Sequence, residues 1–223
     1  MQFFKSPLSK DYWRESSAQV KNLRMLVVAA LMVALRVALK SIYIPVGDNL
    51  NIMAGFFINA LGSMIYGPVL AALTGVASDL LGVMLFPKGP YFFPFTIIEM
   101  MGSVIYALYL YRAKLSPARI FLSKLTINVF INIICNSIAL SWLYGRAVGI
   151  YLIPRVAKNL LIFPLEAILL TLFLSAMAPV VRRLGMDIGE QPKLVINRSH
   201  IVILAALFIV SVAAVAAYYA WFL

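Results

Sequence analysis

Three polar side chains at the start of an apolar run are well placed to bind a small anion. In YLIPRVAKNLLIFPLE, residues 151–166, Arg155, Lys158 and Asn159 are spaced three and four residues apart. Side chains at that spacing are neighbours on one face of a helix. The partial positive charge at a helix N-terminus also favours an anion. One interpretation is an anion-binding pocket, and the other is that both cations snorkel to lipid headgroups.

An aromatic, proline-rich stretch, FPKGPYFFPFT at residues 86–96, is the second candidate for ligand binding. Proline stiffens the backbone, and aromatic faces suit a flat ring. The stretch therefore predicts a lid over a pocket, with an aromatic belt at the membrane interface as the alternative. The polar side chains of Lys88 and Thr96 among the aromatic rings favour the lid. The predicted ligand contacts are Lys88, Phe92, Phe93, Phe95 and Thr96.

Asparagines recur every four residues at Asn128, Asn132 and Asn136, so they share one face of a helix. Amides are costly against lipid and are expected to point into a bundle. They either join helices together or bind a ligand. We assign Asn136 to the site and Asn128 to a structural role.

Three carboxylates, Asp79, Glu99 and Glu166, lie within apolar segments. An isolated carboxylate there costs about 2.5–3.5 kcal/mol, so each is expected to have a partner or to be protonated. Glu99 lies one turn beyond the predicted lid, where it can accept hydrogen bonds from an N–H-rich ring. For Asp79 and Glu166, structural pairing and ligand binding stay open.

Motifs of hydrolytic and metal enzymes are absent from the sequence. It contains no GxxxxGK[ST], HExxH, CxxC or GxSxG pattern, and one histidine, His200, cannot build a metal site alone. We therefore expect a binding protein with no catalytic activity and no cofactor.

The elements that position these residues are expected to be membrane-spanning helices. Of 223 residues, 63% are hydrophobic and only 12% are charged, with a mean hydropathy of +0.95, whereas soluble domains are about 45–50% apolar and about 25% charged. The net charge of +11 is mostly juxtamembrane, which disfavours a nucleic-acid partner. Apolar runs predict seven spans, at 24–44, 49–66, 69–86, 95–111, 119–143, 154–181 and 201–223.

Lys and Arg are unevenly divided between the predicted loops. They cluster at residues 5–24, around residues 112–119 and around residues 182–198. By the positive-inside rule these segments are cytoplasmic, and so is the N-terminus. Arg155 and Lys158 then begin a helix on the outer side.

The order and spacing of four motifs resemble the substrate-binding S components of energy-coupling-factor (ECF) vitamin transporters, and most closely the folate family. The motifs are IYGPVLAALTGVASDLLGVMLFPKGPYFFPFT, IYALYLYR, NIICNSIALSWLYGR and LIPRVAKN. The resemblance implies an all-α polytopic membrane protein with a six-helix S-component bundle over residues 24–184. We expect residues 1–23 to be a cytoplasmic N-terminal segment, 185–200 a cytoplasmic linker and 201–223 a seventh transmembrane helix.

The resemblance also implies a function. Such subunits, in the bacterial cell membrane, capture a vitamin in an outward-facing pocket, dock on a transmembrane T component coupled to two ATPases, and topple to release the vitamin inside. Folate is the expected substrate, and another vitamin or a pterin derivative is the alternative. The family pocket, between loops after helices one, three and five, adds Trp142, Tyr144 and Arg146 to the site. The family's AxxxA docking pattern matches Ala30, Ala34 and Ala38, where internal helix packing is the other interpretation.

Overall fold

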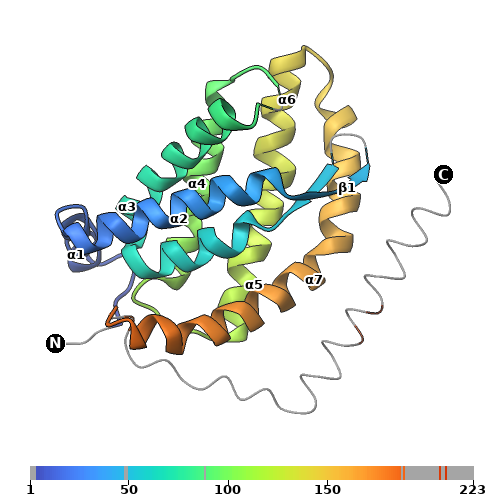
Figure 1. Ribbon diagram of the computed structural model, residues 1–223. Coiled ribbons are helices and arrows are strands. Elements are labelled where there is room, and N and C mark those ends of the chain that lie inside the picture. Colours follow the sequence, from blue (N-terminus) through green and yellow to red (C-terminus); the bar gives the residue numbers. More distant parts are fainter. Residues whose placement is uncertain are drawn as a thin grey trace.

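The computed structural model describes residues 4–47, 50–87, 89–186, 188, 206 and 209 and shows a helical bundle (Figure 1). The predicted all-helical membrane fold is confirmed, with one short β-hairpin added. The elements in chain order are α1 (Lys10–Gln19), α2 (Leu23–Ser41), β1 (Tyr43–Gly47), β2 (Leu50–Met53), α3 (Gly55–Leu85), α4 (Phe93–Leu110), α5 (Pro117–Thr126), the π-helix η1 (Ile127–Cys135), α6 (Asn136–Tyr144) and α7 (Val148–Arg183).

The hairpin corrects the predicted boundaries of the first two spans. Helix α2 ends at Ser41 rather than at residue 44, and the next helix begins at Gly55 rather than at residue 49. Between them, β1 and β2 pair antiparallel, with Ile44 opposite Ile52. The segment between the helices is rich in β-branched residues and contains Pro45, which favour an extended chain over a helix.

Helix α3 contains the predicted break between the second and third spans. Gly67 has φ 81° and ψ 177°, a backbone conformation that glycine adopts easily and other residues rarely do, and Pro68 follows it. Figure 1 shows the two limbs of α3 meeting at an angle there. The N–H of Val69 donates to Ser16 Oγ of α1 over 3.0 Å, so α1 satisfies a backbone group that the break leaves without a helical partner.

The second limb of α3 packs closely on α4 because small residues line the contact. Thr74, Gly75 and Ser78 are buried at three- and four-residue spacing, whereas Gly82, also buried, lies against the Lys40 side chain of α2. A Cβ at Gly75 would lie 2.8 Å from the Cα of Met100. The two helices therefore approach to backbone contact, which fixes the position of α4 beside the site.

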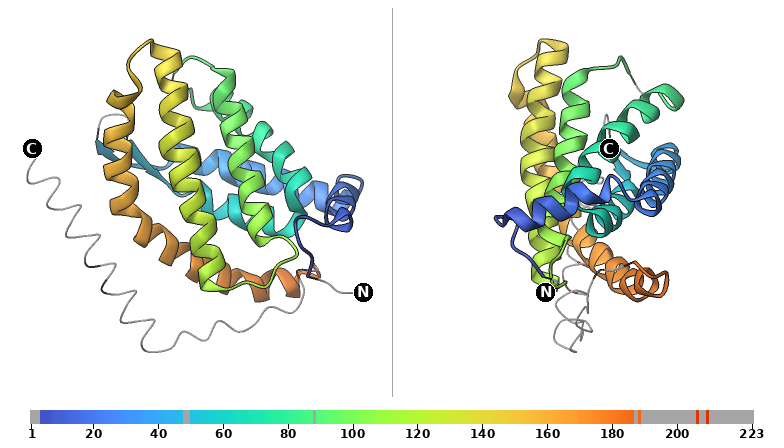
Figure 2. Two further views of the ribbon diagram at one scale, coloured as in Figure 1. Left: turned by 180° about the vertical axis from the view of Figure 1, so that it is seen from behind. Right: turned by 90° about the vertical axis from the view of Figure 1, so that its left-hand side faces the viewer.

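The fifth predicted span forms α5, η1 and α6 as one stack of turns, and the sixth forms α7. Figure 2 shows the C-terminal limb of α7 running past the lower end of α5. Helix α7 contains three prolines, Pro154, Pro164 and Pro179. It begins at Val148, earlier than predicted. The predicted seventh span, 201–223, lies outside the described residues apart from residues 206 and 209.

Counting the limbs of α3 separately, the described chain has six long helical segments, α2, both α3 limbs, α4, the α5–α6 stack and α7. Length and hydropathy allow four of the described helices to cross a membrane, or five if α1 and α2, bent by 79°, form one broken span. These features describe a multi-pass membrane protein.

Candidate substrate-binding site

A cavity of about 350 Å³ lies among α2, α3, α4, the α5–α6 stack and α7. Its lining is unusually rich in charge for the interior of an apolar bundle. It contains five cations and two carboxylates, so its net charge is positive. The charged residues are Arg36, Lys40, Lys124, Arg155, Lys158, Glu99 and Glu166.

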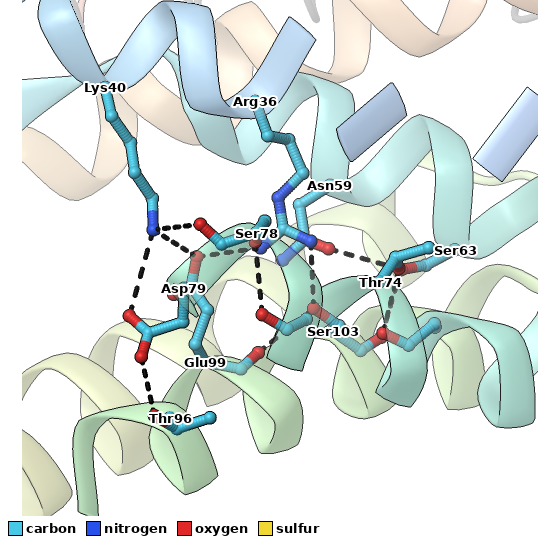
Figure 3. A network of polar contacts seen from close by, with 12 residues as sticks. Arg36, Lys40, Asn59, Ser63, Thr74, Ser78, Asp79, Thr96, Glu99 and Ser103 are labelled. Carbon is cyan, nitrogen blue, oxygen red and sulfur yellow. Dashed lines mark hydrogen bonds and ion pairs between the residues drawn. The ribbon is translucent and has the colours of Figure 1, made fainter. Parts of the chain in front are cut away.

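The first charged group joins α2 to α4. Arg36 Nη2 lies 2.8 Å from Glu99 Oε1, and Arg36 Nη1 donates to Ser103 Oγ over 3.3 Å. Lys40 Nζ lies 3.6 Å from the same Glu99 oxygen and 3.9 Å from Asp79 Oδ1 (Figure 3). The two cations follow each other by one helical turn, so both reach the carboxylate from one face of α2.

The same network provides cationic partners for the carboxylates of Glu99 and Asp79. Glu99 is paired with two cations, as expected for a carboxylate in an apolar segment. Asp79 accepts a 2.7 Å hydrogen bond from Thr96 Oγ1, and Figure 3 shows it beside Lys40. Asp79 therefore makes structural pairs, whereas Glu99 both pairs and lines the cavity.

The second charged group joins α5 to α7. Lys124 is 2% exposed, and its Nζ lies 3.1 Å from Glu166 Oε2 and 3.8 Å from the centroid of the Phe56 ring. Asn128 Nδ2 donates to the same Glu166 oxygen over 3.2 Å, and Asn132 Nδ2 donates to Asn128 Oδ1 over 3.1 Å. The π-helical turns of η1 thus place Asn128 and Asn132 in a hydrogen-bonded chain that ends at the Lys124–Glu166 ion pair. Turns of this kind are frequent at functional sites.

Arg155, Lys158 and Asn159 line one wall of the cavity. Arg155 Nη1 makes a long, 3.5 Å contact with the carbonyl of Asn132. Asn159 is 7% exposed and donates to the carbonyl of Arg155 over 2.9 Å. Because α7 begins at Val148, these residues lie two to three turns inside the helix. The prediction that a helix N-terminus adds positive charge beside these three residues is therefore wrong, because that field fades within the first turn.

The structure brings five of the predicted site residues together at the cavity: Glu99, Asn136, Arg155, Lys158 and Asn159. Asn136 also donates to the carbonyl of Ile131 over 3.0 Å. Asn128 is buried but does not line the cavity.

Seven other predicted residues do not line the cavity. Phe92 packs edge-on against Phe95 and Trp142, with ring centroids 5.7 and 5.6 Å apart. Thr96 is buried against Asp79. Phe93, Trp142, Tyr144 and Arg146 are exposed. The predicted aromatic cluster exists, but it lies beside the cavity rather than in its wall, and Lys88 lies outside the described residues.

Seven polar lining residues were not among the predicted site residues, although a ligand role for Asn132 and Glu166 was left open. The seven are Arg36, Lys40, Asn59, Tyr106, Lys124, Asn132 and Glu166. Lys124 had a usable signal, because a lysine within an apolar segment needs a partner. Tyr106 had none, since an isolated tyrosine in a span is typical of a core residue.

The predicted docking alanines lie on the opposite side of α2 from its buried cation. Ala30, Ala34 and Ala38 are all exposed, whereas Arg36 is 2% exposed. The interpretation that these alanines pack within the chain is therefore wrong for the described residues. Partner docking itself stays a prediction.

Comparison with known proteins identifies the family. Residues 20–178 match the family described as "ECF-type riboflavin transporter, S component". The chain belongs to the ECF S components. The S component is 36% identical over 154 residues to the folate transporter FolT of Clostridium novyi (strain NT), which covers 68% of this chain and 88% of the relative. It is 31% identical over 150 residues to the folate transporter FolT of Leuconostoc mesenteroides, covering 64% and 80%.

A solved structure extends the comparison to three dimensions. The crystal structure of FolT bound with folic acid is similar to this S component with a TM-score of 0.62 and 28% sequence identity, covering 67% of this chain and 91% of that one. The predicted family resemblance is confirmed. Among the described residues, no group of three or more His, Cys, Asp or Glu side chains lies close enough to hold a metal ion.

Proposed function

We propose that this S component captures folate at the outer face of a bacterial cell membrane. The observation that carries the proposal is the net positive charge of the cavity, with Arg155 and Lys158 on one wall. Folate brings two glutamate carboxylates, which cations bind through charge-assisted hydrogen bonds. The two relatives from Clostridium novyi and Leuconostoc mesenteroides are folate transporters, which supports the same substrate.

Riboflavin, named in the description of the matching family, is the second candidate. Riboflavin carries no carboxylate, so it would leave the excess positive charge of the cavity uncompensated. An excess of buried cations is costly without a counter-charge. The charge of the lining therefore favours folate, with another anionic vitamin or pterin derivative as the alternative.

The remaining parts of the proposal concern transport. The N-terminus is cytoplasmic, because the positively charged segments at residues 5–24 and around residues 112–119 favour that side. The exposed stripe of Ala30, Ala34 and Ala38 docks on a T component, because small residues let another helix approach closely. Two partner ATPases then drive toppling and inward release.

Calorimetric titration of the purified protein with folate, pteroate and riboflavin tests the substrate. Pteroate keeps the ring but lacks the glutamate. We expect folate to bind most tightly and riboflavin most weakly. In Arg155→Gln the loss of a charge-assisted hydrogen bond raises the Kd for folate by about tenfold or more, and the Kd for pteroate less.

Arg183→Gln is the matched control, because it removes an exposed cation from the far end of the same helix. It should leave both dissociation constants unchanged. Riboflavin binding tighter than folate binding would refute the proposed substrate. Equal losses for folate and pteroate in Arg155→Gln would remove the tail-binding role of Arg155.

A further inference from the structure

Helix α1 meets the start of α2 at a sharp angle. The two helices are bent by 79° relative to each other, and each begins at its own side-chain cap, Ser9 for α1 and Asn22 for α2. Figure 1 shows α1 at the end of the bundle where α2 begins. Because α2 is a predicted membrane span, a bend of this size directs α1 along the membrane surface.

One face of α1 is fastened to the bundle. Tyr12 and Ser16, one turn apart, are both 0% exposed. The Tyr12 hydroxyl donates to the carbonyl of Ala107 over 3.0 Å, and Ser16 accepts the backbone hydrogen bond from the break in α3. Glu15 Oε2 lies 3.2 Å from Arg112 Nε. These contacts fix the rotation of α1 about its axis, so its opposite face is directed away from the protein.

That opposite face combines cations with an indole ring. It forms a stripe at three- and four-residue spacing, which consists of Lys10, Trp13, Arg14 and Ser17. All four side chains are exposed. Trp13 is 42% exposed, and Leu8, just before the helix, is 96% exposed. Indole rings and apolar side chains beside Lys and Arg are typical of helices at the boundary between lipid headgroups and acyl chains.

Further cations gather at the same end of the bundle. The N–H of Lys5 donates to the carbonyl of Arg112 in the α4–α5 loop over 2.9 Å, and Arg24 Nη1 donates to the carbonyl of Gly185 after α7 over 3.2 Å. These three segments carry, among the described residues, Lys5, Lys10, Arg14, Lys21, Arg24, Arg112, Lys114, Arg182 and Arg183. Their described acidic residues are Asp11, 2.7 Å from Arg14, and Glu15. This end of the bundle therefore carries a large excess of positive charge.

We propose that the exposed face of α1 binds the headgroups of anionic phospholipids in the cytoplasmic leaflet. Lys10 and Arg14 pair with lipid phosphates, and Trp13 lies where the headgroups meet the acyl chains. The cytoplasmic side follows from the orientation proposed above, but lipid binding goes beyond the proposed function because it does not depend on the ligand of the cavity. Helix α1 precedes residues 20–178, so this surface lies outside the family match.

Charge and exposed apolar area together select this partner. The cytoplasmic leaflet is negatively charged, and each Lys or Arg held near such a surface strengthens binding by about fivefold. An acidic protein surface would match the cations equally well. It would leave Leu8 and Trp13 without an apolar environment, whereas a lipid surface accommodates both kinds of side chain.

Native mass spectrometry of the purified full chain in detergent tests the surface, with phosphatidylglycerol and phosphatidylcholine as probes. The unmodified protein should bind phosphatidylglycerol more tightly, by about tenfold or more. Lys10→Gln/Arg14→Gln should raise the Kd for phosphatidylglycerol by about twentyfold, from two cations at about fivefold each, and leave the Kd for phosphatidylcholine unchanged.

Arg119→Gln/Arg146→Gln is the matched control, because it removes two exposed arginines outside α1. It should change the Kd for phosphatidylglycerol by less than about twofold. Both double variants should keep the melting temperature within about 2 °C of the unmodified protein, since the replaced side chains are exposed. Equal losses of lipid affinity in the two double variants, or no preference for phosphatidylglycerol in the unmodified protein, would overturn the proposal.

A chain with one tryptophan reports where α1 lies. Trp142→Phe/Trp221→Phe leaves Trp13 as the single tryptophan of the sequence. In nanodiscs, phosphatidylglycerol brominated on its upper acyl chain should quench the fluorescence of Trp13, and adding Lys10→Gln/Arg14→Gln should reduce that quenching by about half or more. Unquenched Trp13 overturns the proposal. So does a loss of uptake in Lys10→Gln/Arg14→Gln with unchanged lipid binding, which would assign the face to a protein partner.

Discussion

Replacing Lys124 by methionine tests how much the buried Lys124–Glu166 ion pair stabilises the fold. The side chain of Lys124 is 2% exposed, and its ammonium group lies 3.1 Å from Glu166. Methionine has a similar length and preserves the contact with Phe56, but it leaves the Glu166 carboxylate without its cation. We therefore expect Lys124→Met to destabilise the fold.

The magnitude follows from the cost of an unpaired carboxylate. Within a membrane span that cost is about 2.5–3.5 kcal/mol, and breaking a buried ion pair on one side costs about 3–5 kcal/mol. For a chain of this size each kcal/mol shifts the melting temperature by about 2–4 °C. The expected decrease is about 5–20 °C.

The assay is thermal unfolding of the purified protein in detergent, followed by the intrinsic fluorescence of its tryptophans. Lys21→Met is the matched control, since Lys21 is exposed in the turn between α1 and α2, and it should shift the melting temperature by no more than about 2 °C. The double variant Lys124→Met/Glu166→Gln should regain most of the loss, because neither charge of the pair is left without its partner and Gln can still accept from Asn128. A double variant as unstable as the sum of both single variants would refute the pairing argument.

Two further predictions concern close packing and docking. Gly75→Ala should destabilise the protein by about 1–3 kcal/mol in the same unfolding assay, because its Cβ would lie 2.8 Å from the Cα of Met100; a stability equal to that of Gly102→Ala, whose added Cβ would lie 3.9 Å from its nearest neighbour, Ile131 Cγ2, would contradict the close approach of α3 and α4. Ala34→Trp should leave folate affinity unchanged and abolish uptake by cells that express the partner subunits, because Ala34 is exposed on α2. Normal uptake would exclude this face of α2 from docking.

Sequence reasoning located most helices because apolar runs, prolines and glycines mark where a chain enters and leaves lipid. It located the break between the spans 49–66 and 69–86, where Gly67 and Pro68 interrupt the apolar run. In the structure Gly67 has a backbone conformation that only glycine adopts easily. It extended the second span into the hairpin, because a short apolar run with β-branched residues has the same composition in a strand as in a helix. The spacing of charges could not correct that boundary.

The candidate site was less predictable, because its contacts join residues far apart in the chain. The spacing of Arg155, Lys158 and Asn159 was sufficient to place them on one helical face, and they share the cavity wall. Nothing local links Arg36 to Glu99, which lie on α2 and α4 and meet only when both helices pack on α3. Likewise, the aromatic loop signals a cluster, but the packing of Phe92 on Trp142 depends on where α6 ends.

The distribution of ion pairs within the cavity predicts a preference for anions. Arg36 and Lys40 share Glu99 within 4 Å, and Lys124 is held by Glu166, so these three cations are largely neutralised before a ligand arrives. Arg155 has only a carbonyl at 3.5 Å within the described chain. A ligand carboxylate beside Arg155 gains a charge-assisted pair without breaking an existing one, whereas beside Lys124 it would first have to displace Glu166. We therefore expect the cavity to select an anion and to bind it at the Arg155 end.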